Sequence, residues 1–140
     1  MNYKIAIPSY KRAETLCSKT LNYLLEICKV DKNLITVFVA NQYEYDEYFK
    51  VIPKGIKIII GKETLRGQRN FMDFYFEKGT KVIFFDDDIE GIYKKNKSKT
   101  HLFTDIITLC KIGFNECVKN STALFGICAV NNGFHMNNKI

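Results

Sequence analysis

The sequence has little of what a zinc site needs. It contains only two histidines, and its five cysteines include no CxxC pair. Structural zinc usually takes four such ligands, often with CxxC spacing, so a zinc centre is disfavoured. The cysteines are odd in number and lie mostly among apolar residues, and we expect buried thiols in a reducing compartment. They are Cys17, Cys28, Cys110, Cys117 and Cys128.

Targeting and membrane-spanning segments are also missing from the pattern. The chain opens directly on a strand-like segment without a basic region or cleavage site, and no apolar run approaches about 20 residues. No internal repeat, low-complexity tract or linker interrupts the 140 residues. With 46% hydrophobic residues, the sequence predicts one cytoplasmic domain over residues 1–140, without a membrane partner.

Two phosphate-binding fingerprints are absent. The chain has neither GxGxxG nor GxxxxGK[ST], which argues against a dinucleotide site of that type and against a P-loop enzyme. A net charge of +6 suits an anionic nucleotide, a nucleic acid or neither. The most basic stretch, residues 94–101, is expected to be a solvated loop. Closure over a phosphate donor and contact with DNA are its alternatives.

What the sequence does contain is an alternation of strand and helix patterns. Continuous β-branched and aromatic runs, typical of parallel strands covered on both faces, predict strands at 3–7, 34–40, 56–60, 81–85 and 123–129. Apolar residues at three- and four-residue spacing predict helices at 16–27, 44–50, 63–77 (ended by Gly79) and 102–117. Together they predict an α/β fold, a three-layer α/β/α sandwich around a mostly parallel Rossmann-like sheet. Tyr43, Tyr45 and Tyr48 are expected to pack a helix with their hydroxyls exposed.

Three consecutive aspartates, Asp86, Asp87 and Asp88, follow the apolar run 81–85. Burying even one unpaired carboxylate costs several kcal/mol, and Mg²⁺ or Mn²⁺ would remove that cost. In an extended chain Asp86 and Asp88 face the same way and Asp87 faces the opposite way. The outer two are therefore assigned to the metal. A solvated turn with a helix cap is the alternative for the three residues taken alone.

Polar segments follow three of the predicted strands, at residues 8–12, 41–44 and 86–88. Because ligands of open α/β sheets bind at the carboxyl ends of the strands, we expect these segments to converge at one edge. An acidic metal site in such a sheet, without a glycine-rich phosphate loop, favours sugar-nucleotide chemistry.

Three motifs resemble those of GT-A nucleotide-sugar glycosyltransferases. They are residues 5–13 (IAIPSYKRA), 66–71 (RGQRNF) and 84–89 (FFDDDI). Within that fold the chain resembles the TET/JBP-associated glycosyltransferases, mostly phage, viral and protist-associated enzymes thought to add sugars to hydroxymethylated pyrimidines in DNA. The similarity runs from about residue 4 to residue 92 and weakens beyond it. It implies a short GT-A domain, a UDP-sugar donor, Mn²⁺ or Mg²⁺, and DNA as the acceptor.

The resemblance also gives the motifs their roles. Asp86 and Asp88 would hold the metal, Ser9 and Tyr10 would contact the ribose and the base, and the arginines would contact phosphate. Gly67 would allow close approach of the ligand to the backbone. The expected nucleotide-sugar-binding residues are Pro8, Ser9, Tyr10, Arg12, Asn41, Gly67, Arg69, Asn70, Asp86 and Asp87.

The chain departs from the family pattern in two places. Many relatives bind the base with an acid directly after the second strand, whereas this chain offers only Asn41 or Glu44 there. An inverting enzyme also needs a general base, and of the acids after the aspartates only Glu90 is a candidate, a weak one. The other two, Asp105 and Glu116, are expected to be surface charges on a helix.

The chain is short for a GT-A domain, so a homo-oligomer or a further chain that completes the fold is an expected partner. A noncatalytic nucleotide- or nucleic-acid-binding module that keeps the fold is the alternative function. A sugar-nucleotide pyrophosphorylase is a weaker one, because its glycine-rich N-terminal signature is absent.

Overall fold

A computed structural model describes residues 3–96 and 99–127. The chain divides into two compact units, Met1–Glu90 and Gly91–Ile140, which are described separately. Whether they make up the single domain expected from the sequence stays a prediction. Within the described residues, no helix is both long enough and apolar enough to span a bilayer.

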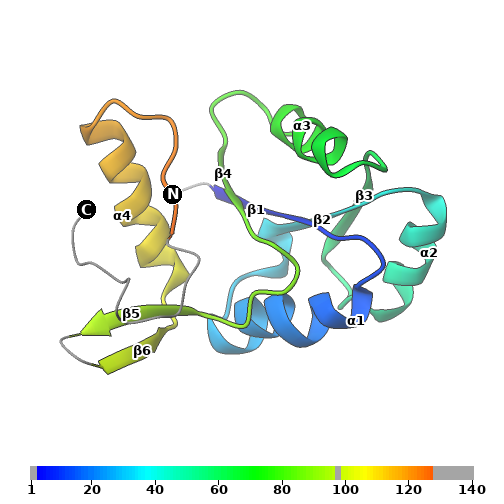
Figure 1. Ribbon diagram of the computed structural model, residues 1–140, viewed down its shortest axis with the longest axis horizontal. Coiled ribbons are helices and arrows are strands. Elements are labelled where there is room, and N and C mark those ends of the chain that lie inside the picture. Colours follow the sequence, from blue (N-terminus) through cyan, green and yellow to red (C-terminus); the bar gives the residue numbers. More distant parts are fainter. Residues whose placement is uncertain (1–2, 97–98, 128–140) are drawn as a thin grey trace. The chain divides into compact units, whose positions relative to one another are not determined.

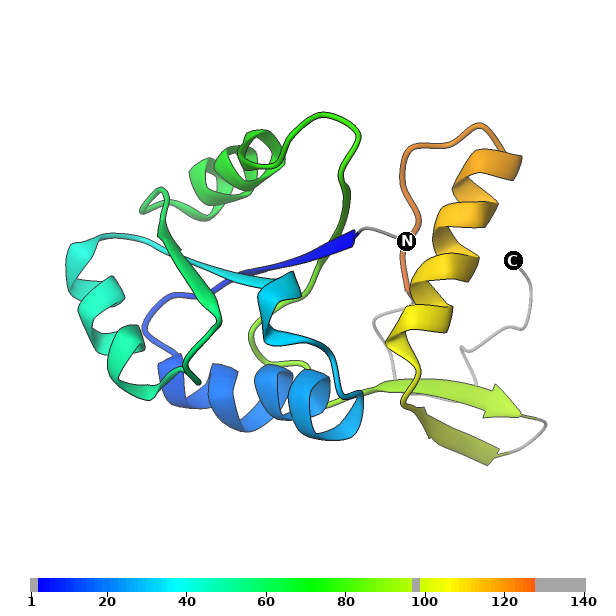
Figure 2. The ribbon, with the colours of Figure 1, turned by 180° about the vertical axis from the view of Figure 1, so that it is seen from behind.

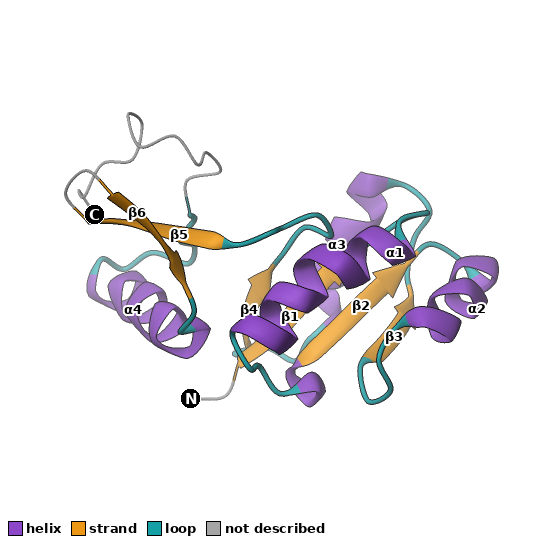
Figure 3. Ribbon diagram, turned by 90° about the horizontal axis from the view of Figure 1, so that it is seen from below, coloured by secondary structure: helices purple, strands orange, loops and turns teal. Residues whose placement is uncertain are grey.

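The first unit is built on a four-stranded sheet. Its strands are β1 (Tyr3–Pro8), β2 (Ile35–Val39), β3 (Lys57–Ile60) and β4 (Lys81–Phe84). Their order across the sheet is β3-β2-β1-β4, and every neighbouring pair is parallel (Figure 3). Four of the five predicted strands and the parallel α/β class are thereby confirmed.

Helices cover both faces of this sheet. On one face α1 (Ala13–Leu16) runs directly into the π-helical segment η1 (Cys17–Ile27), and on the other lies α3 (Leu65–Tyr75) (Figures 1 and 2). The remaining helices are α2 (Gln42–Val51) and the short η2 (Lys32–Leu34). The first unit therefore has the three layers predicted from the strand–helix alternation.

The end of α3 differs from the prediction. The helix stops at Tyr75, because Phe76 already has an extended backbone. Gly79 does not cap it but lies in the following turn, where the Thr80 N–H donates to the Glu77 carbonyl and Gly79 adopts a φ of +90°. Only glycine enters that left-handed region without strain, which accounts for its place in the turn.

The core follows the alternation of side chains along the strands. Ala6, Phe38 and Met72 are fully buried together, with flanking residues of α3 packed around them. The next positions along the strands, including Ile5, Ile7 and Val37, face the opposite way and are also fully buried. Each such side chain contributes about 1.5–3 kcal/mol on burial, so the sheet is held from both sides.

The second unit begins with a hairpin that the sequence analysis missed. Strands β5 (Ile92–Asn96) and β6 (Lys99–Phe103) pair antiparallel, and α4 (Ile106–Lys119) follows. The expectation that 94–101 is a loop is therefore wrong for its described residues. The helix predicted from residue 102 begins later because Asp105 caps it, accepting from the Thr108 N–H at 2.9 Å.

The fifth predicted strand, over 123–129, is also wrong in its described part. Residues 123–127 form no strand, and 128–129 lie outside the described residues. Instead the Phe125 ring packs edge-on against Phe114, with centroids 5.4 Å apart. A Cβ at Gly113 would lie 2.4 Å from the Phe125 ring, so this glycine opens the space that the ring fills.

The cysteines are only partly as expected. Cys110 and Cys117 are buried on α4, whereas Cys17 and Cys28 are half-buried, and none of the four forms a disulfide. Burial raises the pKa of Cys110 to about 11, so its thiol stays protonated and unreactive near neutral pH. The fifth, Cys128, lies outside the described residues.

Candidate functional site

A pocket lies at the carboxyl edge of the sheet, where β1 and β4 are neighbours although β2 and β3 separate them in the sequence. From β1 the chain builds outward through β2 and β3, then crosses back to place β4 on the other side of β1. The strand order thus reverses at β1, and the carboxyl ends of the strands at such a reversal are the usual ligand site of open α/β sheets. A pocket of about 440 Å³ opens there, a size that suits a small-molecule ligand.

Eight residues predicted for the site line this pocket. They are Pro8, Ser9, Tyr10, Arg12, Arg69, Asp86, Asp87 and Asp88. They come from the loop after β1, from α3 and from the loop after β4. Of the three post-strand segments expected to converge at this edge, 8–12 and 86–88 contribute to the pocket, whereas no residue of 41–44 lines it.

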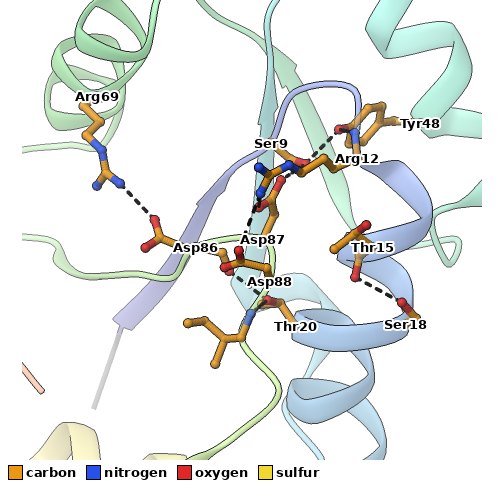
Figure 4. A network of polar contacts seen from close by, with 11 residues as sticks. Ser9, Arg12, Thr15, Ser18, Thr20, Tyr48, Arg69, Asp86, Asp87 and Asp88 are labelled. Atoms are coloured by element: carbon orange, nitrogen blue, oxygen red, sulfur yellow. Dashed lines mark hydrogen bonds and ion pairs between the residues drawn. The ribbon is translucent and has the colours of Figure 1, made fainter. Parts of the chain in front are cut away.

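Asp87 lies at the centre of a hydrogen-bonded chain (Figure 4). The Ser9 hydroxyl donates to Asp87 Oδ2 at 2.6 Å and lies 2.7 Å from the Tyr48 hydroxyl. Tyr48 also accepts from the Arg12 N–H at 3.0 Å. A hydroxyl has one proton to donate, so Tyr48 donates to Ser9 and Ser9 donates to Asp87. All donors therefore point towards the carboxylate.

The burial of Tyr48 and Ser9 supports this direction of the hydrogen bonds. Tyr48 is only 1% exposed, so the expectation of an exposed hydroxyl is wrong for this residue. Its removal from water raises the pKa of Tyr48, which keeps the hydroxyl protonated and able to donate. Ser9 is also buried, and its proton is engaged by Asp87 rather than offered to a ligand.

The three aspartates do not alternate as an extended chain would. Strand β4 ends at Phe84, and Asp87 and Asp88 lie in a turn. The side chain of Asp87 is 11% exposed, against 60% for Asp86 and 49% for Asp88. The expectation that Asp87 differs from its neighbours therefore holds for exposure, but Asp87 does not face fully away, since Arg12 Nη1 reaches both Asp87 and Asp88. Asp86 and Asp88 remain the two that a ligand can reach most easily.

Two arginines approach these carboxylates. Arg12 Nη1 lies 3.4 Å from Asp87 Oδ1 and 3.5 Å from Asp88 Oδ2, and Arg69 Nη2 lies 2.9 Å from Asp86 Oδ1. Two guanidinium groups thus face three carboxylates, which leaves an excess negative charge. Both guanidiniums are about half exposed, so water weakens these pairs and leaves donor groups open to an incoming anion.

Thr20, which the sequence analysis did not assign to the site, fixes the aspartate loop from behind. Its hydroxyl donates to the Asp86 carbonyl at 2.7 Å and accepts from the Ile89 N–H at 2.9 Å. The residue is fully buried on η1. A threonine on the apolar face of a predicted helix was the available signal, because a buried hydroxyl needs polar partners.

The residues considered for base recognition serve the loops instead. Asn41 caps α2 by accepting from the Glu44 N–H at 3.1 Å, and it donates to Glu63 at 3.2 Å. Glu44 is buried and accepts from the Lys11 N–H at 2.8 Å, where Lys11 has a left-handed φ of 54°. Neither Asn41 nor Glu44 lines the pocket, but Glu63, which sequence reasoning missed, does.

Gly67 and Asn70 lie outside the aspartate pocket. They line a second, more open hollow that also includes Phe71 and Phe74. The Gly67 N–H donates to the capping Thr64 hydroxyl at 3.1 Å, and a Cβ at Gly67 would lie 2.7 Å from that oxygen. The close contact with the capping hydroxyl therefore explains why residue 67 is a glycine, and no ligand is needed to explain it.

Glu90, the weak candidate for a general base, is bound elsewhere. It forms an ion pair with Lys19 at 2.8 Å and does not line the pocket. The hydrogen bond from Lys19 lowers the pKa of Glu90, which makes its carboxylate a weaker base.

The carboxylates of this site suit Mg²⁺ or Mn²⁺ only if a bound nucleotide supplies the remaining oxygen ligands. Among the described residues, no group of three or more acidic, histidine or cysteine side chains is placed to hold one ion. Asp86 and Asp88 would give two carboxylate oxygens. Mg²⁺ is commonly held by one or two carboxylates together with phosphate oxygens and water, so the residues fit a metal bound jointly with a nucleotide.

Comparisons with known proteins do not assign this site to a family. No family model, no curated protein and no solved structure matches the chain.

Proposed function

We propose that the chain is a metal-dependent glycosyltransferase of the GT-A type that binds a nucleotide sugar, such as a UDP-sugar, in the pocket between β1 and β4. One observation carries the proposal. Three carboxylates and two guanidinium groups line a single pocket of about 440 Å³ at the point where the strand order reverses. This combination suits a diphosphate accompanied by a divalent cation.

The diphosphate would lie between the arginines and the aspartates. Arg12 and Arg69 would exchange their exposed partners, Asp88 and Asp86, for phosphate oxygens, because a guanidinium can make two parallel hydrogen bonds to such a group. Asp86 and Asp88, once released, would hold Mn²⁺ or Mg²⁺. The bound cation would supply the positive charge that stabilises the leaving diphosphate.

The buried part of the site would keep this geometry in place. Ser9, Tyr48 and Thr20 hold the two post-strand loops through hydrogen bonds of 3.0 Å or less. Loops fixed before the ligand arrives lose less entropy on binding. These three residues would therefore position the site without touching the sugar.

The nucleoside would extend away from the aspartates. Tyr10 lines the pocket with about half of its surface exposed, and Lys11 Nζ lies 5.0 Å from the centre of its ring, so a base would stack on the face that Lys11 leaves open. Glu63 lines the pocket from the segment after β3, where its carboxylate could accept an N–H of a base. These two residues would take the place of the acid that relatives carry after the second strand.

The acceptor follows from the resemblance. We propose a hydroxyl group on a modified pyrimidine in DNA, which would place the enzyme in the cytoplasm of a host cell. None of the described acids is assigned as the general base, since Glu90 is bound to Lys19.

A second function is favoured by one feature of the same site. Each aspartate already has a partner within the chain, namely Ser9 or an arginine. Aspartates that are already paired in this way need no metal to balance their charge, which suits a noncatalytic nucleotide-binding module. It would bind nucleotide sugars but would neither transfer nor hydrolyse the sugar.

The two functions are separated by incubating hydroxymethylated and unmodified DNA with the protein, Mn²⁺ and a panel of nucleotide sugars. Mass spectrometry of the DNA would show a defined hexose adduct on the hydroxymethylated substrate if the chain is a transferase. Donor binding without an adduct or free sugar would support the noncatalytic module.

A further inference from the structure

The β5–β6 hairpin carries basic residues and no acid. Its described residues, 92–96 and 99–103, include Lys94, Lys95 and Lys99 but neither aspartate nor glutamate. This concentration contrasts with the first unit, where most of the basic residues named above have an acidic partner. The hairpin therefore forms a positively charged ribbon.

The register places part of this charge on one face. Lys94 lies directly opposite His101, and Asn96 lies opposite Lys99. Opposite residues of an antiparallel pair point to the same side, as do residues two apart on one strand, so these four share a face. All four are exposed. We call this set, Lys94, Asn96, Lys99 and His101, the basic face.

The basic face is not arranged for the stability of the hairpin. Lys94 and Lys99 are diagonal neighbours on this face, close enough for their long, like-charged side chains to reach each other. Among the ion pairs formed by the described residues, none involves Lys94 or Lys99. A two-stranded ribbon is marginally stable by itself, so this repulsion is a real cost. An anionic partner would offset it.

We infer that the basic face of the β5–β6 hairpin binds the phosphate backbone of duplex DNA. A two-stranded β-ribbon fits the major groove of B-form DNA, which is about 12 Å wide. The major groove of duplex RNA is too narrow for side chains to enter. Apart from His101, the described residues of this face offer no fully exposed ring, since Phe103 is half-buried, so a stacking platform for single-stranded bases is disfavoured. Charge and shape together therefore favour duplex DNA.

The inference goes beyond the proposed function, because it concerns the second unit and does not depend on the aspartate pocket. The hairpin's charge and register carry it without any transfer reaction. Binding through phosphates alone carries no sequence information, so the ribbon would hold DNA of any sequence.

The test compares full-length proteins by fluorescence anisotropy with a labelled DNA duplex at several salt concentrations. The test variant is K94Q/K99Q, and K54Q/K78Q removes equal charge from exposed lysines of the first unit. We expect the slope of log K against log salt to become shallower by about two in K94Q/K99Q, roughly one for each lost phosphate contact, and to stay unchanged in K54Q/K78Q. K94R/K99R should keep the wild-type slope, which shows that the hairpin tolerates substitution.

Three outcomes would overturn the inference. They are equal losses in K94Q/K99Q and K54Q/K78Q, wild-type binding of duplex RNA as tight as that of DNA, and equally tight binding of anionic lipid vesicles. Calorimetry with UDP-sugar and Mn²⁺ on K94Q/K99Q keeps the two proposals apart, because donor binding should be unchanged. If no protein binds the donor but the salt slopes behave as expected, the proposed function fails and the hairpin's role stands.

Discussion

The hydroxyl of Ser9 donates to the carboxylate of Asp87 at 2.6 Å, joining residues that are 78 positions apart. Ser9 follows β1 and Asp87 follows β4, so this bond joins the loops that follow two neighbouring strands of the sheet. Tyr48 and Arg12 extend it through two further hydrogen bonds. The site is therefore organised by a buried polar chain rather than by the exposed carboxylates alone.

Replacing Ser9 by alanine should destabilise the protein by about 2 kcal/mol. The buried Asp87 carboxylate would lose its shortest hydrogen bond, and the Tyr48 proton would lose its acceptor. Denaturant titration followed by circular dichroism measures the free energy of unfolding. An unchanged value would mean that the bond contributes nothing to folding.

Tyr48→Phe should cost about 1 kcal/mol by the same measurement, because the Arg12 N–H would be left without its acceptor. Tyr43→Phe is the matched control, since Tyr43 is 70% exposed on the same helix. The double variant S9A/Y48F should cost less than the two single changes added together, as expected for neighbours in one network. Strict additivity would argue against a connected chain.

Gly67→Ala should destabilise the protein, although alanine is normally favoured over glycine within a helix by about 1 kcal/mol. The new Cβ would lie 2.7 Å from the Thr64 hydroxyl that caps α3. In a Thr64→Ala background, where that oxygen is gone, the same change should be less harmful or even stabilising. Thermal unfolding of the four proteins measures this. If Gly67→Ala stabilises the wild-type protein, the cap is not the reason for the glycine.

Arg69→Gln should separate ligand binding from stability. The Arg69–Asp86 pair is half exposed and contributes about 0–1 kcal/mol to folding, so unfolding should hardly change. Affinity for a UDP-sugar should fall about 10- to 100-fold, as expected for the loss of a charged hydrogen bond. Arg66→Gln, an exposed change on the same helix outside the pocket, is the control. Equal affinities for the two variants would remove Arg69 from the phosphate site.

The cap of α4 should make stability depend on pH. Hydrogen bonds from Thr108 lower the pKa of Asp105 below its usual value of 3.8. A lowered folded-state pKa adds stability that is fully present above the unfolded value and is lost as pH falls through the folded value. Asp105→Asn keeps the capping oxygen without the charge. The difference in unfolding free energy between wild type and D105N should therefore shift in favour of D105N below pH 3.8. A difference that does not vary with pH would contradict this.

The sheet and its edge could be predicted from the sequence because both depend on local patterns. Apolar runs such as residues 35–39 identify strands buried on both faces, and parallel strands bring their carboxyl ends together. Most of the residues expected at the site therefore line the pocket. The hairpin was missed because its lysine content resembles that of a solvated loop, although its alternation suits a ribbon.

The polar chain around Asp87 could not be predicted in the same way. The periodicity of an extended strand placed Asp87 on the far side, but the chain turns directly after β4. Tyr48 and Thr20 approach from helices distant in sequence, so their partners depend on tertiary packing. The strand predicted over 123–129 failed for a related reason, since Phe125 packs against a helix rather than into a sheet.

Calorimetric titration with a UDP-sugar, in the presence and absence of Mn²⁺, tests the proposed site most directly. The variants are Asp86→Asn and Asp88→Asn, whose side chains are exposed enough to be changed without loss of folding, and Asp73→Asn on the surface of α3 is the control. We expect metal-dependent binding in the wild-type protein and in D73N, and its loss in D86N and D88N. Binding that is equally tight in all four proteins, with or without Mn²⁺, would contradict a metal and nucleotide-sugar site at these aspartates.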